Sequence, residues 1–400
     1  METTILMDWE RFSFNYRLNQ AELASDLVKI EAYREAVLNL VLPSDWRQQL
    51  DRLNRVRAVY GTTALEGNPL SEQEVSVQME LMVDPPKTRV TQEQQQIRNS
   101  GLAQDWVRLR FTPDTPKLDL NDILRMHHQL TEGSDEHNNV PGRLRTHPVV
   151  VGTPALGGVH KGAPAERLEE LMTQFLSFVN SREQIEGRHP VIRALVAHFF
   201  LITIHPFGDG NGRVSRLVEA GILFQGGYNV HGFYGLSNYF YRNGDEYKTT
   251  LQMCRGQEPF DVTPFVGFGV KGFAQELKGI NNFIKTKLNR IVYRDTLLRA
   301  FNKKQSDRRR VLNQREFSLL DYLLEQTEPT DPFSERPSRQ MRLEELHKSA
   351  FIGAAYKDVT WRTFVRELMR LAELGFIRFT KADGIDGAIV ELDFEAIGKH

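Results

Sequence analysis

The stretch from His205 to Arg216 reads His-Pro-Phe-Gly-Asp-Gly-Asn-Gly-Arg-Val-Ser-Arg and combines several residue types that bind phosphate. Gly210, Asn211 and Gly212 allow the backbone to turn so that successive N–H groups point into one concavity. Together with the dipole of a helix that follows, such a turn binds anions, above all phosphates. The sequence therefore predicts a phosphate-binding loop that leads into a helix N-terminus.

Other side chains in the same stretch supply the chemistry that phosphate transfer needs. Arg213 and Arg216 offer guanidinium groups suited to phosphate oxygens. Asp209 places a carboxylate beside the phosphate site, where Mg²⁺ shared with a nucleotide requires one. His205 can act as a general base near neutral pH. We expect Phe207, an apolar residue in a polar loop, to be buried and to anchor the loop.

The complete stretch resembles the signature of the Fic family, His-Pro-Phe-x-(Asp/Glu)-Gly-Asn-Gly-Arg-x-x-Arg, at every specified position. So many matches in one loop disfavour the alternative of a surface turn with solvated side chains. The resemblance covers about residues 50–275 and includes His127 and the segment Pro141–Arg145. It implies a mainly α fold with a Fic helical core. The implied reaction is transfer of AMP from ATP, with Mg²⁺, to a Ser, Thr or Tyr hydroxyl of a target protein or of the protein itself.

The resemblance also implies a role for each residue of the loop. His205 would deprotonate the target hydroxyl, and Asp209 would hold Mg²⁺ on the α- and β-phosphates. The Gly-Asn-Gly turn would hold those phosphates, with Asn211 contributing its side-chain amide. Arg213 and Arg216 would bind the outer phosphates. A metal site built instead on His198 and His205 remains a weak alternative, because Asp209 is its one nearby acidic partner.

The end of the site that would hold adenosine is less sharply marked. Tyr239 and Tyr247 stand where family members have aromatic residues near the base and ribose, and core packing would explain them equally well. Some relatives carry an Asn near Met253–Arg255 that helps to hold the nucleotide, and this sequence has none there. The segment His147–Pro164 resembles the family's flap, a β-hairpin that holds the target by strand addition. A purely structural hairpin is the alternative.

An inhibitory motif precedes the predicted core. The run Thr62-Thr63-Ala64-Leu65-Glu66-Gly67 resembles the family motif (Ser/Thr)-x-x-x-Glu-(Gly/Asn), with Thr62, Glu66 and Gly67 at its specified positions. This position implies the subclass with an N-terminal inhibitory helix. An acidic side chain paired with Arg216 would occupy the guanidinium that the ATP γ-phosphate needs. In some relatives the equivalent Glu also supports AMP removal, so the sequence leaves the direction of the reaction open.

The elements that must position these residues are mainly helical. The apolar run His189–Ile204 predicts a buried helix that leads into the loop. The Val-, Gly- and Pro-rich segment His147–Pro164 predicts a short β-hairpin. Apolar residues at helical spacing predict further helices at 21–41, 44–59, 92–109, 121–131, 165–179, 214–224 and 276–305. Ser71 with Glu74 fits a capping box that opens one more helix.

The C-terminal region has a different pattern. Three candidate helices, the third closed by Gly375, precede two β-like runs, Phe376–Thr380 and Ala388–Leu392, joined by Asp-Gly turns. This order is typical of a winged helix-turn-helix domain. We therefore expect four regions: an N-terminal helical region with the inhibitory motif (1–110), a Fic catalytic core (111–275), a helical connector (276–309) and a winged-helix domain (310–400).

Composition limits the possible partners. The 400 residues carry a formal net charge of −1, which gives no support to bulk binding of nucleic acid or membranes. Cys254 is the only cysteine, so a disulfide framework and a Cys-rich zinc site are excluded. No apolar run is long enough to span a bilayer and no secretory signal opens the chain, so we expect a cytoplasmic protein.

The charge of the last hundred residues bears on DNA binding. Arg362, Thr363 and Arg366 could face a major groove, but basic and acidic residues are equally numerous in this region. DNA binding is therefore possible but not favoured over protein docking. The resemblance also implies a homodimer. An autoinhibited adenylyltransferase is the leading hypothesis. The alternatives are removal of AMP or transfer of another phosphate-containing group by the same site, and a DNA-binding regulator whose Fic domain senses nucleotide.

Overall fold

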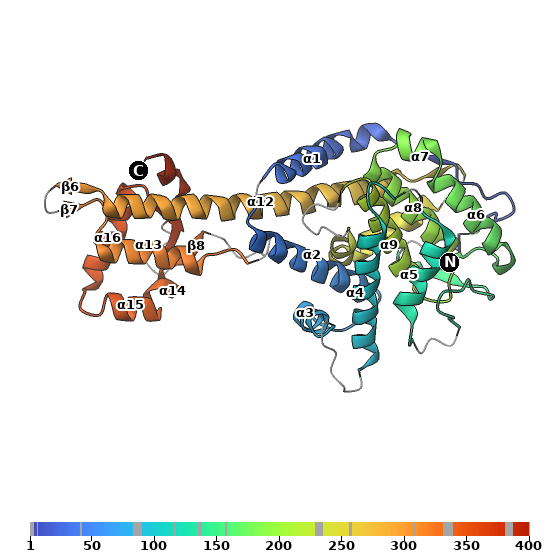
Figure 1. Ribbon diagram of the computed structural model, residues 1–400, viewed down its shortest axis with the longest axis horizontal. Coiled ribbons are helices and arrows are strands. Elements are labelled where there is room, and N and C mark those ends of the chain that lie inside the picture. Colours follow the sequence, from blue (N-terminus) through green and yellow to red (C-terminus); the bar gives the residue numbers. More distant parts are fainter. Residues whose placement is uncertain are drawn as a thin grey trace. The chain divides into compact units, whose positions relative to one another are not determined.

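The computed structural model is mainly α-helical, with a short β-hairpin and a small C-terminal sheet, as predicted. It describes residues 4–5, 7–40, 42–82, 90–115, 117–134, 138–156, 158–228, 235–255, 258–306, 309–330, 339–380 and 387–399. The chain forms two compact units, residues 1–277 and 278–400 (Figure 1). None of the described helices is long and apolar enough to cross a membrane.

The helix α8 (Pro190–Ile204) is the centre of the N-terminal unit. Every residue after Pro190 is buried, which explains why the segment is apolar on all sides. It packs against α9 (Asn211–Gln225), α6 (Leu168–Val179) and α7 (Arg182–Gly187). Because α8 and α9 are consecutive and packed together, the loop of residues 205–210 is held at one end of the pair.

The helix α2 (Ser44–Ala64) carries the predicted inhibitory motif at its C-terminal end. It packs against α10 (Ser237–Arg242), α4 (Gln92–Arg110) and α3 (Glu72–Glu80). The predicted capping box before α3 is present, because the side chains and backbones of Ser71 and Glu74 bond reciprocally.

The predicted hairpin consists of β3 (Val150–Thr153) and β4 (Gly158–Lys161), which pair antiparallel. The N-terminal strand β1 (Thr4–Ile5) pairs in parallel with the other edge of β4. The sheet order is therefore β1-β4-β3, and β3 is an edge strand. The other elements of this unit before α12 are β2 (Tyr16–Arg17), α1 (Gln20–Leu38), α5 (Leu120–Thr131), α11 (Gly244–Cys254) and β5 (Phe260–Asp261).

The long helix α12 (Thr263–Asn302) begins earlier than the sequence analysis predicted. The expected start was Glu276, because the pattern turns polar there. Phe265, Val270 and Phe273 precede that point and are buried, so the apolar first part of α12 belongs to the N-terminal unit. Buried and solvated helical segments show different periodicity, so the two parts of this one helix have different sequence patterns.

The C-terminal unit has the predicted winged-helix order. Its core includes Tyr293 of α12 and Leu368, Leu371 and Phe376. Thr360 caps α16 (Trp361–Glu373), and Gly375 follows this helix with φ of +80°. The elements are β6 (Lys304–Ser306), β7 (Arg309–Arg310), α13 (Gln314–Gln326), β8 (Gln340–Arg342), α14 (Leu343–His347), α15 (Ala350–Ala355), α16 (Trp361–Glu373), β9 (Ile377–Thr380) and β10 (Ile389–Leu392).

Three details of this unit differ from the prediction or go beyond it. The strand β8 was not predicted; it forms one edge of the antiparallel sheet β8-β10-β9. The short helix α15 was not predicted either. The Asp-Gly turns predicted between the last two strands fall mostly in residues 381–386, which lie outside the described residues.

The close approach of α2 to α10 yields a stability prediction. A Cβ at Gly61 would lie 2.5 Å from the backbone N and 2.6 Å from the Cα of Asn238. We expect Gly61→Ala to lower the free energy of unfolding by about 1–3 kcal/mol through overpacking, although alanine favours helix. Chemical denaturation measures this change. Gly353→Ala is the matched control, because no atom lies within 4 Å of its Cβ position, and an equal loss in both variants would contradict the packing argument.

Candidate functional site

The predicted loop, the inhibitory motif and α11 meet around one cavity of about 350 Å³. The residues singled out from the sequence that line it are Glu66, His205, Asp209, Gly210, Asn211, Gly212, Arg216 and Tyr247. Thr62, Phe207 and Arg213 contact this set without lining the cavity. Gly67 follows α2 with φ of +91°, a conformation that glycine adopts at no steric cost.

His205 ends α8 in a left-handed conformation with φ of +57°. It is the one non-glycine residue with positive φ in the described part of the chain. The buried guanidinium of Arg145 holds this turn, donating from Nε to the carbonyl oxygen of His205 at 2.7 Å and from its other nitrogens to those of His147 and Ala163. Such uncommon backbone persists where its surroundings enforce it, and it often marks functional sites.

Phe207 anchors the loop as predicted, because its ring is fully buried. The ring stacks on His127 with 3.8 Å between centroids. The Asn211 amide donates to the Phe207 carbonyl oxygen and accepts from the Phe207 N–H, both at 2.9 Å. The Asn211 side chain therefore closes the loop. The amide nitrogen carries two N–H groups and only one bonds to Phe207, so the phosphate contact expected for Asn211 stays a prediction.

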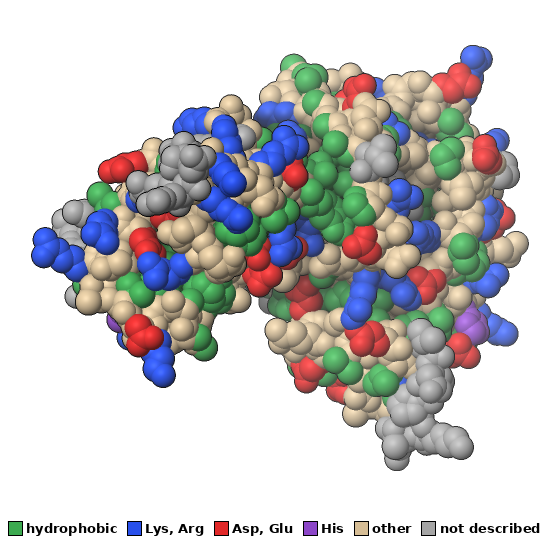
Figure 2. All heavy atoms as spheres, turned by 60° about the vertical axis from the view of Figure 1, so that its left-hand side comes forward, with side chains coloured by type: hydrophobic (Ala, Val, Ile, Leu, Met, Phe, Trp, Pro, Cys, Tyr) green, Lys and Arg blue, Asp and Glu red, His purple; other side chains and the backbone are tan. Residues whose placement is uncertain are grey.

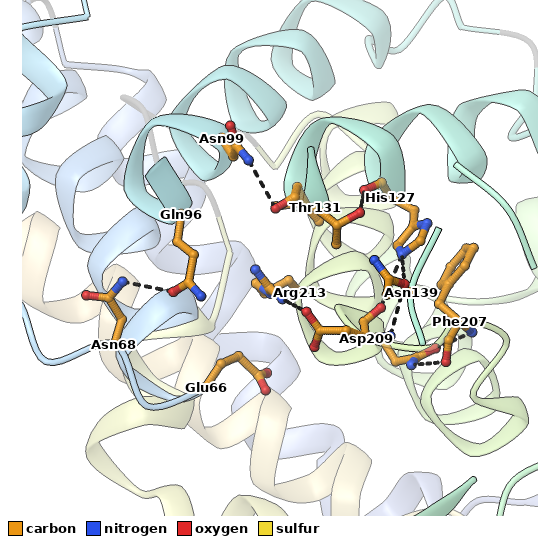
Figure 3. A network of polar contacts seen from close by, with 12 residues as sticks. Glu66, Asn68, Gln96, Asn99, His127, Thr131, Asn139, Phe207, Asp209 and Arg213 are labelled. Carbon is orange, nitrogen blue, oxygen red and sulfur yellow. Dashed lines mark hydrogen bonds and ion pairs between the residues drawn. The ribbon is translucent and has the colours of Figure 1, made fainter. Parts of the chain in front are cut away.

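His127 fixes the next part of the loop (Figure 3). Its Nδ1 accepts from the Gly142 N–H at 3.0 Å, so the ring proton is on Nε2. Nε2 then donates to the carbonyl oxygen of Asp209, at 3.2 Å, or to Oδ1 of Asn139, at 3.1 Å. Burial lowers the pKa of His127 to about 4, which keeps this neutral tautomer at physiological pH.

The N-terminus of α9 faces the cavity through glycine residues. Gly210 precedes the helix with φ of +76° and offers no side-chain cap, so the first N–H groups of α9 are left for a ligand. A Cβ at Gly212 would collide with Oε1 of Glu66, so a larger residue here would displace that carboxylate. Beside the turn, the Asp209 carboxylate pairs with Nη2 of Arg213 at 2.5 Å.

The guanidinium of Arg216 joins α9 to the inhibitory motif. It donates to Oε1 of Glu66 at 2.5 Å, to Oγ1 of Thr62 at 2.8 Å and to the Thr62 carbonyl oxygen at 3.2 Å. Burial by itself would raise the pKa of Glu66, but the charge and hydrogen bond of Arg216 lower it below its ordinary value. About 39% of the Glu66 side chain stays accessible, and it lines the cavity.

His205 is held as a neutral imidazole. Its Nδ1 lies 3.1 Å from the carbonyl oxygen of Ile202, so the proton is on Nδ1 and Nε2 is free to accept one. Burial lowers the pKa of His205 to about 4, and the positive charges of Arg255 and Arg145 act in the same direction.

The two predicted aromatic residues differ in position. Tyr239 is not brought to the cavity, because it is buried against Phe268 of α12, with 5.0 Å between ring centroids. Tyr247 does line the cavity, and its hydroxyl lies 3.0 Å from Nε2 of His198. The other nitrogen of His198 lies 2.6 Å from Glu219, which leaves neither for a metal. The described residues contain no cluster of three or more potential metal ligands from His, Cys, Asp and Glu.

Sequence reasoning missed the cavity wall that α11 provides. Lys248, Gln252 and Arg255 line the cavity at a spacing of four and three residues, one face of a helix. This helical spacing of polar residues can be seen in the sequence. However, the sequence of one helix does not show which of its faces will contact a loop that is distant in sequence. Arg145 lies in the segment Pro141–Arg145, which resembles the family but for which the sequence predicts no specific role.

Comparison with known proteins agrees with this geometry. Residues 117–223, which contain the complete loop, match the model of the Fic/DOC family. This segment is therefore similar in sequence to the Fic/DOC family. It is 29% identical over 203 residues to the protein adenylyltransferase Fic of Aedes aegypti and 32% identical over 174 residues to protein adenylyltransferase fic-1 of Caenorhabditis briggsae. The alignments cover 50% and 42% of this chain but only 38% and 32% of those relatives.

Solved structures of Fic proteins share the fold. A Fic family protein from Desulfovibrio desulfuricans superposes with a TM-score of 0.54 at 18% identity, covering 95% of this chain and 98% of that one. The Fic-1 structure from C. elegans gives a TM-score of 0.54 at 23% identity, covering 67% of this chain and 74% of that one. These structural similarities show a shared fold.

The low pKa of His205 predicts its titration behaviour. We expect the imidazole to stay neutral down to about pH 4, as followed by NMR of ring-labelled histidine with His205→Ala to assign the signal. The unfolded chain takes up this proton near pH 6.5, so the stability that His205 contributes declines as the pH falls from about 6.5 to 4. A midpoint near 6.5 in the folded protein would contradict the burial argument.

Proposed function

We propose that this protein transfers AMP from Mg-ATP to a hydroxyl group of a protein, and that Glu66 restrains the reaction. The observation that carries the proposal is the ion pair between Glu66 and Arg216 beside an intact phosphate loop. The adenylyltransferase names of the relatives support the choice of reaction.

The proposed chemistry uses the neutral imidazole of His205. Nε2 accepts the proton of the target hydroxyl as its oxygen bonds to the α-phosphorus and the bond to the pyrophosphate oxygen breaks. The free N–H groups at the start of α9 stabilise the negative charge on the transferred phosphate. The low pKa keeps the imidazole unprotonated at neutral pH, so Nε2 is available as the proton acceptor.

Asp209 is the residue that would hold Mg²⁺. Its side chain is about 35% accessible and lines the cavity beside the helix N-terminus, and a single carboxylate fits a cation that is also bound by phosphate oxygens and water. Such a cation neutralises phosphate charge and orients the leaving group. Its binding would require Asp209 to share or give up its contact with Arg213.

Glu66 restrains the reaction by competition for one cation. Arg216 is only 3% exposed and already has three acceptor contacts, so a γ-phosphate would compete with Glu66 for it. The negative charge of Glu66 in the cavity also repels phosphate. The same carboxylate could orient water for removal of AMP, which is the alternative direction of the proposed reaction.

The flap would hold the target. The edge strand β3 contributes Val151, Gly152 and Thr153 to the cavity wall, and Val150 is exposed. Because β1 covers the opposite edge of the hairpin, a target segment would pair with β3.

The winged-helix unit fits protein docking better than DNA binding. Arg315 pairs with Glu367, Arg370 with Glu316 and Arg378 with Asp393, so these cations are already neutralised. On the face that Figure 2 displays, basic and acidic side chains are interspersed. DNA affinity depends largely on unpaired positive charge, which is why DNA remains the less favoured partner.

The central test is incubation with labelled ATP followed by mass spectrometry. We expect Glu66→Gly to raise AMP transfer by about 10- to 100-fold, the amount that a charged hydrogen bond contributes. Glu66→Gly combined with His205→Ala should give no transfer, because the proton acceptor is lost.

Glu80→Gln is the matched control for removal of a carboxylate. Glu80 pairs with Arg52 at the surface and does not line the cavity, so its loss should leave transfer unchanged. Equal transfer by wild type and Glu66→Gly would sink the proposed restraint. Absence of transfer from both would sink the proposed reaction.

A further inference from the structure

Glu66 lies beyond the last residue of α2, in the turn that ends this helix. The N–H of Gly67 donates to the carbonyl oxygen of Ala64, and the N–H of Asn68 donates to the carbonyl oxygen of Thr63, both at 3.0 Å. Because Gly67 has a left-handed conformation, these two bonds form a Schellman motif. The position of the Glu66 carboxylate therefore depends on how this turn is held.

The side chain of Asn68 holds the turn against α4 (Figure 3). Its Nδ2 donates to the carbonyl oxygen of Glu93 at 3.1 Å and to Oε1 of Gln96 at 2.9 Å. Its Oδ1 accepts from the N–H of Leu70 at 3.1 Å, a bond typical of an Asx-turn. Asn68 is only 8% exposed. One buried amide thus uses both of its N–H groups and its oxygen to join the end of α2 to α4 and to the chain that leads into α3.

The part of α4 that Asn68 contacts is itself well held. Thr91 and Gln94 form a reciprocal capping box, which orders the first turn of this helix. The helix packs against both α2 and α9, and α9 carries Arg216. Asn68 therefore ties the turn that carries Glu66 to the helices around the ionic partner of Glu66. About 39% of the Glu66 side chain is accessible, so the surrounding atoms do not by themselves confine the carboxylate.

We propose that Asn68 is a positioning residue whose bonds to α4 keep Glu66 on Arg216. The inference rests on the proposed function, because it concerns the same restraint. Without the two bonds the turn can move away from α4, and the population of molecules with an unpaired Arg216 increases. While that population is small, transfer rises by the same factor as the population. The inhibitory motif identified in the sequence ends at Gly67, so the restraint depends on a residue outside it.

The test compares Asn68→Ala in the presence of Glu66 and in the Glu66→Gly background. With labelled ATP, we expect Asn68→Ala to raise AMP transfer by about three- to tenfold when Glu66 is present, the effect of one or two hydrogen bonds. In the Glu66→Gly background it should change transfer by less than about twofold, because no carboxylate is left to position. Lower transfer in both backgrounds would indicate a merely structural role and would overturn the proposal.

Two further variants separate the contact with α4 from the turn. Asn68→Asp keeps the acceptor for the N–H of Leu70 but places a carboxylate against the oxygens of Glu93 and Gln96, so it should raise transfer at least as much as Asn68→Ala. Wild-type transfer by Asn68→Asp would contradict the role of α4. Should Asn68→Ala fail to fold in a thermal denaturation assay, Gln96→Ala removes one acceptor at a half-buried helix position that suits alanine and carries the same comparison.

Asn99→Ala is the matched control. Asn99 is a second amide of α4, 5% exposed, and its Nδ2 also donates to two carbonyl oxygens, those of Leu130 and Glu132. These bonds reach the end of α5 rather than the turn after α2. Loss of this amide should lower stability without raising transfer. An equal rise in Asn99→Ala and Asn68→Ala would mean that general loosening is the cause, and the positioning role would be wrong.

Calorimetry with inorganic tripolyphosphate separates this inference from the proposed reaction. We expect Asn68→Ala to bind it about three- to tenfold more tightly than wild type when Glu66 is present, and the gain should disappear in the Glu66→Gly background. That gain without any AMP transfer would count against the proposed reaction alone. Higher transfer by Glu66→Gly, with no effect of Asn68→Ala on binding or transfer, would overturn the positioning role alone.

Discussion

The buried positive charge of Arg216 is the constraint on which much of the site depends. A guanidinium that solvent barely reaches must have acceptors, and both Thr62 and Glu66 come from the end of α2. This requirement fixes where α2 lies against α9. This position of α2 also depends on Gly61, which can approach α10 closely because it has no side chain. The proposed restraint of the site and the packing of the N-terminal helices thus rest on the same contact.

The loop of residues 205–210 combines atoms that have partners within the protein with N–H groups that are left for a ligand. The first N–H groups of α9 can face the cavity because other polar atoms of the loop already have hydrogen-bond partners within the protein. Arg145 and His127 hold its carbonyl oxygens, and Asn211 closes it across Phe207. Because these contacts already hold the loop in place, ligand binding does not have to order it. The first N–H groups of α9 are then left without side-chain partners at the wall of the cavity.

Much of the fold followed from local patterns. The buried helix α8, the hairpin β3–β4, the capping box at Ser71 and the order of the C-terminal helices and strands were predicted because periodicity and turn residues are properties of short segments. The start of α12 was not, because a helix that passes from a core to a more solvated stretch changes its pattern midway. The strand β8 was missed because so short a strand has little pattern of its own and depends on pairing with β10.

The sequence by itself determined which residue types stand together in the loop. His205, Asp209, the glycine turn and the two arginines lie within twelve residues, so their order alone predicts a phosphate-binding loop. Tertiary structure decided which other residues join them. It brought Glu66 to Arg216, placed Tyr247 but not Tyr239 at the cavity, and assigned the Asn211 amide to the loop. It also brought Arg255 into the wall. Such contacts depend on how helices distant in sequence pack, and no local pattern encodes the face that each one presents.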